Sequence, residues 1–351
     1  MIRRLFTQCQ LRPGDVSPSR ADMEVVGTFN PGAIEFEGEI VLLVRVAERP
    51  KERRPGWTPL PRYEPGGGIM IDQVPDEHLV PIDPRVVRRK SDGCVRITSV
   101  SHLRVMRSGD GRRIDSIDGP RFLPEADYET FGVEDPRITR IDDRYYLTYV
   151  AVSPHGAATA LASTRDFRQF DRHGIIFCPE NKDVLLFPEK IGGRYAALHR
   201  PNPATHFSHP EMWLAYSDDL VSWGDHTPLL GGGSTWDAGR IGGGCPPVRT
   251  QRGWLEIYHG NDKAGEDGDV GRYFGAAFMM DGDDPSRIVA QSGGPIMAPE
   301  ADFETDGFVP NVVFPTAMIE RGDKFLIYYG AADASTGVVG LARDELLAAL
   351  Q

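Results

Sequence analysis

Short apolar runs that each end in a tight turn recur along the whole chain. In every copy an apolar strand pattern is followed by small residues and then by an aspartate, as in 102–111 and 159–167. The copies are marked by Asp110, Asp166, Asp219, Asp284 and Asp344. By subtraction of these numbers, successive markers lie 56, 53, 65 and 60 residues apart. A period of this length indicates a fold built by repeating one supersecondary unit.

A second type of apolar strand precedes several of these markers, and the chain shows no convincing helical periodicity. Its copies are 145–149, 254–259 and 324–329. Several short strands per repeat predict an all-β fold, and five markers predict a five-bladed β-propeller. We therefore expect a single propeller domain spanning residues 1–351, with helix confined to a short C-terminal segment, 344–350. A β-sandwich whose turns resemble one another by chance is the alternative.

Two segments near the N-terminus contrast in composition. Residues 38–46 form an apolar run that predicts a buried strand. Residues 47–68 are rich in Pro, Arg and Gly, and they predict a long loop.

Charge and cysteine content narrow the class of protein. The net charge of −12 argues against a nucleic-acid partner, which needs a basic face, but it leaves room for a local cationic pocket. No apolar stretch approaches the roughly 18 residues of a membrane span, and no apolar run follows Arg3 and Arg4 as in a secretory signal. The cysteines lie far apart, so neither a disulfide framework nor a metal site is expected: Cys9, Cys94, Cys178 and Cys245. We expect a reduced, cytoplasmic protein.

The segment 131–139 carries the densest candidate chemistry. Its Glu134-Asp135-Pro136-Arg137 run stands directly before the strand pattern at 145–149. Because proline disfavours helix at the preceding residue, Asp135 is expected on a rigid turn at a strand entrance. A carboxylate held there suits proton transfer. An ordinary salt-bridged strand entrance is the alternative.

Further polar residues lie near other predicted strand starts or in Gly-rich turns. They are Asn30, Arg45, Lys182, His199, Arg200, Arg240 and Asp333. In a propeller the strand-entry loops converge on one mouth, where the basic members would form a site for an anion. A structural ion pair between Arg45 and Asp333 is the alternative for these two. Tyr258, with Trp213 and Trp236, offers a face that could stack on a sugar ring, although core packing is the ordinary role of such residues.

Several ordered motifs across residues 25–345 together resemble glycoside hydrolase family 130. They are 131–139 with Tyr145-Tyr146, 187–190 with 198–201, 236–247, 253–260, and 311–315 with 328–333. Members of this family are five-bladed propellers that act as β-mannoside phosphorylases, with a minority of β-mannosidases. The segments 181–183 and 199–200 make the 1,2-linked mannoside members the most similar.

The resemblance implies a role for each candidate. Asp135 becomes the general acid, acting through a hydroxyl of the bound mannose. Asn30, Arg45 and Asp333 fall where family members hold the mannose ring, and we add Tyr258 as a further substrate-binding residue. The implied phosphate-binding residues are Lys182, His199, Arg200 and Arg240. Arg240 stands where the family pattern W-D-x-x-K has lysine, so the charge is kept while the geometry changes.

The sequence therefore predicts an inverting phosphorylase that converts β-1,2-mannobiose or β-1,2-oligomannosides to mannose 1-phosphate. No cofactor is expected beyond inorganic phosphate as co-substrate, and the partners are the mannoside and phosphate, with homo-oligomer formation left open. An inverting, exo-acting β-mannosidase is the first alternative. It would need a carboxylate base for water, with Glu189, Glu211 and Glu256 as candidates. A non-catalytic sugar-binding propeller is the second alternative, since a fold alone does not fix a function.

Overall fold

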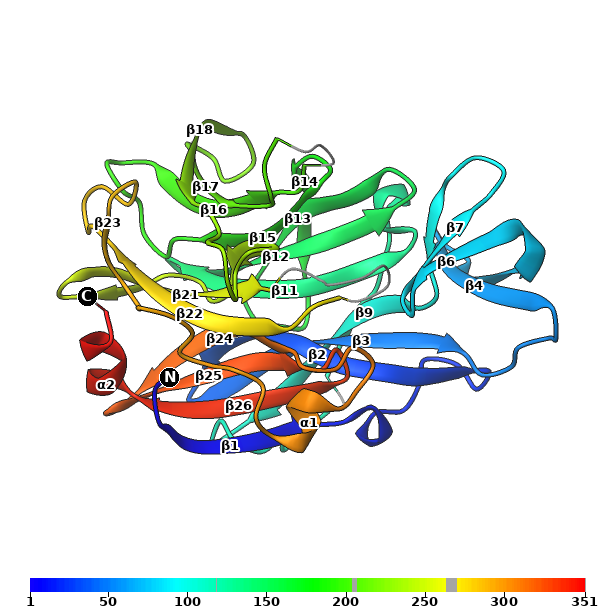
Figure 1. Cartoon of the computed structure of the whole chain (residues 1–351), viewed down its shortest axis with the longest axis horizontal. Coiled ribbons are helices and arrows are strands. Elements are labelled where there is room, and N and C mark those ends of the chain that lie inside the picture. Colours follow the sequence, from blue (N-terminus) through cyan, green and yellow to red (C-terminus); the bar gives the residue numbers. More distant parts are fainter. Residues whose placement is uncertain (118, 204–206, 263–269, 351) are drawn as a thin grey trace.

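The protein is built almost entirely of β-strands. A computed structural model describes residues 1–117, 119–203, 207–262 and 270–350. The expected all-β class is confirmed (Figure 1). Helix within these residues is limited to α1 (Asp302–Thr305), α2 (Arg343–Ala348) and the short 3₁₀ turns η1 (Pro13–Asp15), η2 (Asp76–His78) and η3 (Asp127–Glu129). No helix in the described part of the chain is long and apolar enough to cross a membrane.

Antiparallel strands make up the larger sheets. The longest runs in the order β14 (Asp171–Phe177), β13 (Gly156–Thr164), β12 (Arg144–Ser153), β11 (Gly132–Ile141), β9 (Val100–Ser108), β3 (Glu39–Pro50) and β2 (Met23–Phe36), with β10 (Arg121–Phe122) beside β9. The next consists of β15 (Asn181–Leu186), β16 (Tyr195–Pro201), β17 (Met212–Ser217) and β18 (Trp223–Leu230). Another consists of β19 (Arg240–Gly243), β21 (Gly253–Asn261), β22 (Tyr273–Met280) and β23 (Ile288–Gln291), with β20 (Val248–Thr250) on β21.

The two ends of the chain meet in one sheet. It runs in the order β1 (Arg4–Leu11), β26 (Ser335–Ala342), β25 (Lys324–Ala331) and β24 (Val313–Arg321). The first strand therefore completes a sheet whose other strands come from the last forty residues of the chain (Figure 1).

The longest sheet consists of two antiparallel groups that touch through one parallel contact. β9 and β11 are parallel, and Gly132 of β11 pairs with Ser101 of β9. Gly132 has a φ of +119°, and a Cβ there would lie 2.7 Å from the backbone nitrogen of Ser101. Glycine therefore allows the two groups of strands to approach at this point.

The hydrophobic core is divided among the spaces between neighbouring sheets. One cluster joins Leu43 of β3 to Leu147 of β12, and the next joins Leu161 of β13 to Leu186 of β15. A third cluster packs β16 and β17 against β21 and β22. A fourth packs β21 and β22 against β25 and β26, and a fifth packs β25 and β26 against β3. Polar residues at the strand ends are thereby left free to build a site.

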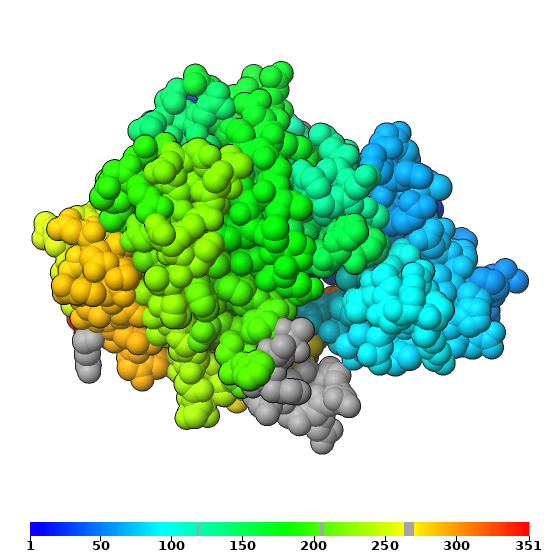
Figure 2. Space-filling view, turned by 90° about the horizontal axis from the view of Figure 1, so that it is seen from above, coloured from blue at the N-terminus to red at the C-terminus, as the bar shows by residue number. Residues whose placement is uncertain are grey.

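An extension of small strands projects from one side of the molecule. It holds the hairpin β4 (Trp57–Glu64) and β5 (Gly68–Pro75) and the sheet β6 (Leu79–Asp83), β7 (Val86–Arg89) and β8 (Val95–Ile97). In Figure 2 it forms the blue-to-cyan lobe beside the main body. The loop predicted for 47–68 is therefore wrong over 57–64, and also over 47–50, which continue β3. The prolines at 59 and 61 fit a strand because β4 pairs on one side only, with β5.

The recurring aspartates close turns after strands, as their spacing predicted. Asp110, Asp166 and Asp219 each accept hydrogen bonds from the backbone N–H groups two and three residues ahead. In the fourth copy this pair of bonds is made by Asp281 rather than by the marker Asp284. The fifth marker lies in the first turn of α2. The repeat is thus a repeat of turn chemistry.

We expect the sheet that joins the chain ends to depend on the ion pair between Arg4 and Glu304. Glu304 is fully buried, and its Oε1 lies 2.7 Å from Nη1 of Arg4 on β1. Arg4→Met leaves the buried carboxylate without its cation and should lower the free energy of unfolding by about 3 kcal/mol. Urea denaturation measures this loss. Arg3→Met is the matched control because the Arg3 side chain is 77% exposed, and its effect should stay within about 0.5 kcal/mol. Equal effects of the two changes would contradict the assignment.

Candidate active site

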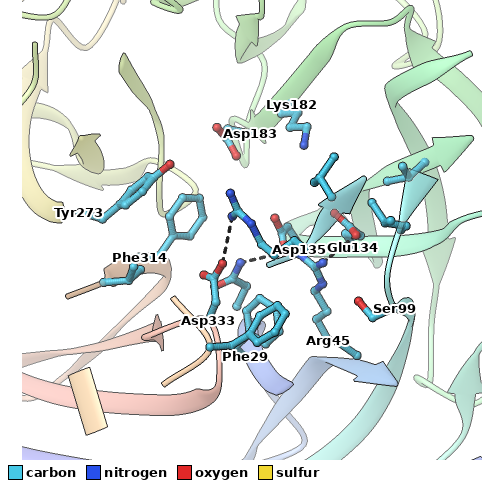
Figure 3. Close-up of a pocket in the computed structure, with 18 of the residues that line it drawn as sticks. Phe29, Arg45, Ser99, Glu134, Asp135, Lys182, Asp183, Tyr273, Phe314 and Asp333 are labelled. Atoms are coloured by element: carbon cyan, nitrogen blue, oxygen red, sulfur yellow. Dashed lines mark hydrogen bonds and ion pairs between the residues drawn. The ribbon is translucent and has the colours of Figure 1, made fainter. Parts of the chain in front are cut away.

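A cavity of about 270 Å³ opens where strand ends from several sheets converge. Seven of the nine residues predicted for the site line it: Asn30, Arg45, Asp135, Lys182, Arg200, Arg240 and Asp333. Figure 3 shows Asp135 and Glu134 between Lys182 and Asp183 on one side and Arg45 and Ser99 on the other. Phe29, Tyr273 and Phe314 add aromatic faces to the wall. The cavity has the mixture of apolar walls and a few convergent polar groups that is typical of a small-molecule site.

The same backbone conformation, with a positive φ, directs three of the polar side chains. Asn30, Asp135 and Asp183 have φ values of +48°, +48° and +55°. Each lies where the strand pairing is irregular, in β2, β11 and β15 respectively. Bulges of this kind bend a strand and redirect its side chains, and Asn and Asp tolerate the left-handed conformation better than most residues. Proline follows Asn30 and Asp135, which fits the rigid turn predicted for Asp135.

Asp135 is held by two donors from neighbouring strands. Its Oδ1 accepts hydrogen bonds from Asn30 Nδ2 at 2.8 Å and from Arg45 Nη1 at 2.9 Å. The other end of the Arg45 guanidinium donates to Glu134 Oε1 at 2.6 Å. Burial alone would raise the pKa of Asp135, but Arg45, Arg137 and these hydrogen bonds outweigh it and lower the pKa. Among these protein groups alone, Asp135 is therefore ionised at neutral pH.

Asp333 faces Asp135 across the cavity but has a different partner. Its Oδ2 lies 3.2 Å from Nη1 of Arg85, which reaches in from the turn between β6 and β7 and also contacts Asp83. The alternative of a direct Arg45–Asp333 ion pair is wrong, because Arg45 is bonded to Glu134 and Asp135. Burial raises the pKa of Asp333, with a further contribution from Asp135, against the opposing effect of Arg85 and Arg45.

The basic side chains gather around Asp183. Arg200 Nε donates to Asp183 Oδ2 at 2.7 Å. Burial opposes ionisation of Asp183, but Arg200, His259 and Arg137 lower its pKa to about 2. The ammonium of Lys182 and the guanidinium of Arg240 have no carboxylate partner among the described residues, and Nε of Arg240 is buried without a hydrogen bond. Two cations with uncommitted donors in one cavity can hold an anion.

Two predicted site residues lie outside the cavity. His199 is 3% exposed, and its ring nitrogens are hydrogen-bonded to Asn181 and His226. Burial, aided by His226, lowers the pKa of His199 to about 3, so it is neutral and cannot serve as the predicted cation. Tyr258 is 1% exposed in the core, and its hydroxyl accepts a hydrogen bond from Gln291. Core packing, the ordinary role, therefore applies to Tyr258.

The sequence interpretation missed some residues of the cavity wall. Arg85 is the clearest case, because it belongs to the extension and no motif singled it out. Tyr273 and Phe314 also line the cavity, and they stand beside His259, whose ring nitrogens are buried without partners. The sequence interpretation included Asp183 only as part of a motif and gave it no role, although its ion pair with Arg200 fixes the position of a basic residue in the cavity wall.

Comparison with known proteins adds to this geometry. A family model described as beta-1,4-mannooligosaccharide phosphorylase matches residues 79–351. The chain belongs to glycoside hydrolase family 130. This confirms the family predicted from the ordered motifs.

Relatives match most of the chain or nearly all of it. A β-1,2-mannobiose phosphorylase from Listeria innocua is 41% identical over 347 residues, covering 97% of this chain and 96% of the relative. A 1,2-β-oligomannan phosphorylase from a Thermoanaerobacter species is 37% identical and covers 70% of this chain and 80% of the relative. The solved structure of a Listeria innocua β-1,2-mannobiose phosphorylase with β-1,2-mannobiose superposes with a TM-score of 0.90, at 40% identity and 96% coverage of each chain. The similarity to 1,2-linked members is confirmed as well.

We expect the carboxylate of Asp333 to reduce stability at neutral pH. A carboxyl whose pKa is raised by folding favours the folded state below its unfolded pKa of about 3.9, and this advantage is lost as the pH rises through the folded pKa. Asp333→Asn removes that loss, so the variant should melt at a higher temperature than the wild type at pH 7 while losing activity. Thermal melts at pH 4 to 7 test this, with the exposed Asp306→Asn as the control. A variant that melts lower than the wild type at pH 7 would show that the Arg85 pair outweighs burial.

Proposed function

We propose that this protein is an inverting phosphorylase that cleaves β-1,2-mannobiose or β-1,2-oligomannosides with inorganic phosphate and releases mannose 1-phosphate. Relatives with these linkages in their names match most of the chain, which supports the substrate class. Phosphate enters as a co-substrate, and the proposed reaction uses no other cofactor. The observation that carries the proposal is the pair of cations, Lys182 and Arg240, that share the cavity with Asp135 and have no carboxylate partner among the described residues.

The charges of the cavity suit phosphate as the nucleophile. Glu134 and Asp135 are paired with Arg45, Asp183 with Arg200, and Asp333 with Arg85. A phosphate dianion placed between Lys182, Arg240 and the guanidinium of Arg200 would neutralise the charges of Lys182 and Arg240, which have no carboxylate partner among the described residues. It would be held by fixed donors in a partly buried site, where charge-assisted hydrogen bonds are strong.

Binding of phosphate also explains how Asp135 can act as an acid. A proton donor must be protonated when the leaving sugar departs, yet the surrounding protein groups lower the pKa of Asp135 and favour its ionised form. A nearby anion disfavours a second negative charge and therefore raises the pKa of the carboxyl. We propose that bound phosphate shifts Asp135 toward its protonated form, with the proton then passing through a hydroxyl of the mannose held by Asn30, Arg45 and Asp333.

The mannosidase alternative has weaker support. An inverting hydrolase needs a carboxylate base that can hold water on the face opposite the acid. The candidates Glu189, Glu211 and Glu256 do not line the cavity in the described structure. Burial raises the pKa of Glu256 well above its usual value, which disfavours the carboxylate form that a base needs, and Glu211 lines a separate hollow beside Trp213. The carboxylates that do line the cavity are engaged by arginines.

The proposal includes the architecture expected from the repeats. We propose one domain with five blades: β2–β3–β9–β10, β11–β14, β15–β18, β19–β23, and β24–β26 completed by β1. The core clusters between successive groups support a circular arrangement. A cytoplasmic location is part of the proposal, because a charged sugar phosphate does not cross membranes unaided. Homo-oligomer formation stays a prediction.

Activity should depend on phosphate, and Lys182 should carry much of that dependence. We expect mannose 1-phosphate from β-1,2-mannobiose with phosphate and no free mannose without it. Lys182→Met should raise the KM for phosphate at least about tenfold, which corresponds to the loss of one charge-assisted contact of roughly 1.5–3 kcal/mol. Lys190→Met, at an exposed position, is the control.

Initial rates against phosphate concentration make this measurement. Free mannose released without phosphate would instead establish the mannosidase, and the absence of either product would favour the sugar-binding protein.

Asp135→Asn should fold normally and lose nearly all turnover. The amide keeps the size of the side chain but cannot donate the proton, and losing a positioned acid typically costs on the order of 10²–10⁴-fold in rate. Asp143→Asn, at an exposed turn beyond the far end of the same strand, is the control. Turnover close to that of the wild type would assign Asp135 to the ordinary salt-bridged strand entrance.

A further inference from the structure

Arg137 lies directly beneath the cavity and is closed off from solvent. Its side chain is 1% exposed, although it stands two residues after the proposed acid. Nη1 donates to the backbone oxygen of Asp135 at 3.0 Å. The guanidinium therefore supports the main chain of the bulge that carries Asp135, while the carboxyl of Asp135 points into the cavity.

The same guanidinium reaches the strand that carries Arg240. Nε of Arg137 donates to the backbone oxygen of Gly244 at 2.6 Å, directly after β19. The N–H group of Gly244 donates in turn to Glu256 Oε1 at 2.9 Å. A Cβ at Gly244 would lie 2.2 Å from the backbone oxygen of Ile257, so the peptide has no room to move toward β21. The end of β19 is thus fixed from both sides, by Arg137 and by Glu256.

The remaining guanidinium nitrogen of Arg137, Nη2, faces Asp183. This nitrogen lies 3.9 Å from Asp183 Oδ1 and has no hydrogen-bond partner, although it is buried. Asp183 is the partner of Arg200. One cation therefore stands between the bulge of Asp135, the strand of Arg240 and the carboxylate that orients Arg200. A buried arginine with an unused donor is costly unless its position serves several neighbours at once.

We propose that Arg137 is a positioning residue that sets the distance and orientation between the proton donor and the phosphate-binding cations. In a displacement where phosphate attacks while Asp135 supplies a proton, both groups must fit the same substrate, and a misplacement of about 1 Å can cost on the order of 10²-fold in rate. Only a planar fork can bond the Asp135 and Gly244 carbonyls and face Asp183 together. This inference rests on the proposed phosphorolysis.

Arg137→Lys removes the planar guanidinium but keeps the positive charge, so it tests whether the geometry of the donors matters. We expect kcat to fall about 100-fold and the KM for phosphate to rise, with the KM for β-1,2-mannobiose within about twofold of the wild type. Arg96→Lys is the matched control, because Arg96 is also buried and also donates to a backbone oxygen, that of Leu60 in the extension. It reports the general cost of replacing a buried arginine. A folded Arg137→Lys enzyme with kcat within about threefold of the control would overturn the proposal.

Glu256→Met tests the same support from the other side of the Gly244 peptide group. It removes the acceptor of the Gly244 N–H group, and we expect kcat to fall while Glu256→Gln, which keeps an acceptor oxygen, stays near the wild type. These variants test the proposal even if Arg137→Lys does not fold. Equal kcat values for the two changes at Glu256 would overturn it.

A pH profile separates positioning from a purely structural role. Arg137→Met removes a charge that lowers the pKa of Asp135, while Arg45, Glu134 and Asp333 still face that carboxyl. The alkaline limb of kcat should therefore move to higher pH than in the wild type. An unmoved limb would overturn the link to Asp135. Failure of the proposed function would appear separately, as phosphate-independent release of mannose by the wild-type enzyme.

Discussion

Burial of charge at the convergence of the sheets is the constraint on which the rest of this structure depends. The acidic residues of the cavity are each compensated by an arginine, from Arg45 at Asp135 to Arg200 at Asp183. Removing the arginine from such a pair leaves a buried carboxylate without compensation and costs several kcal/mol, so the arginines stabilise the fold as well as the site. Lys182 and Arg240 remain without such compensation in the described structure. An anion bound between these two cations would supply the missing compensation.

Much of the site could be predicted because the backbone device that builds it is visible in the sequence. Asn30-Pro31 and Asp135-Pro136 place a polar residue with a positive φ before a proline, and both were identified. Asp183 has the same conformation without a following proline, so its local sequence gives a weaker signal. Arg85 could not be predicted, because its place in the cavity depends on how a projecting extension folds back onto the main body.

The errors in the site prediction have a common physical origin. His199 and Tyr258 were placed in the site by their residue type and motif, yet burial decides the behaviour of both. A buried imidazole without a carboxylate beside it loses its charge, and a buried tyrosine ring packs like any other apolar group. Strand alternation near a site tells which residues share a face, but it does not tell whether that face meets the cavity or the core. The strands and turns were predicted better, because spacing and turn chemistry are local properties.

The pairing of β1 with β26 has a consequence for how the chain assembles during synthesis. Residues 4–11 are synthesised long before their partners at 336–341. Such a distant contact closes slowly, since the loop entropy is lost before the strands gain their hydrogen bonds. Until then the N-terminal strand has no sheet to join, and an open edge waits for it on β26 once that strand has formed. The nascent protein is therefore most exposed to edge-to-edge aggregation just before its final strand pair forms.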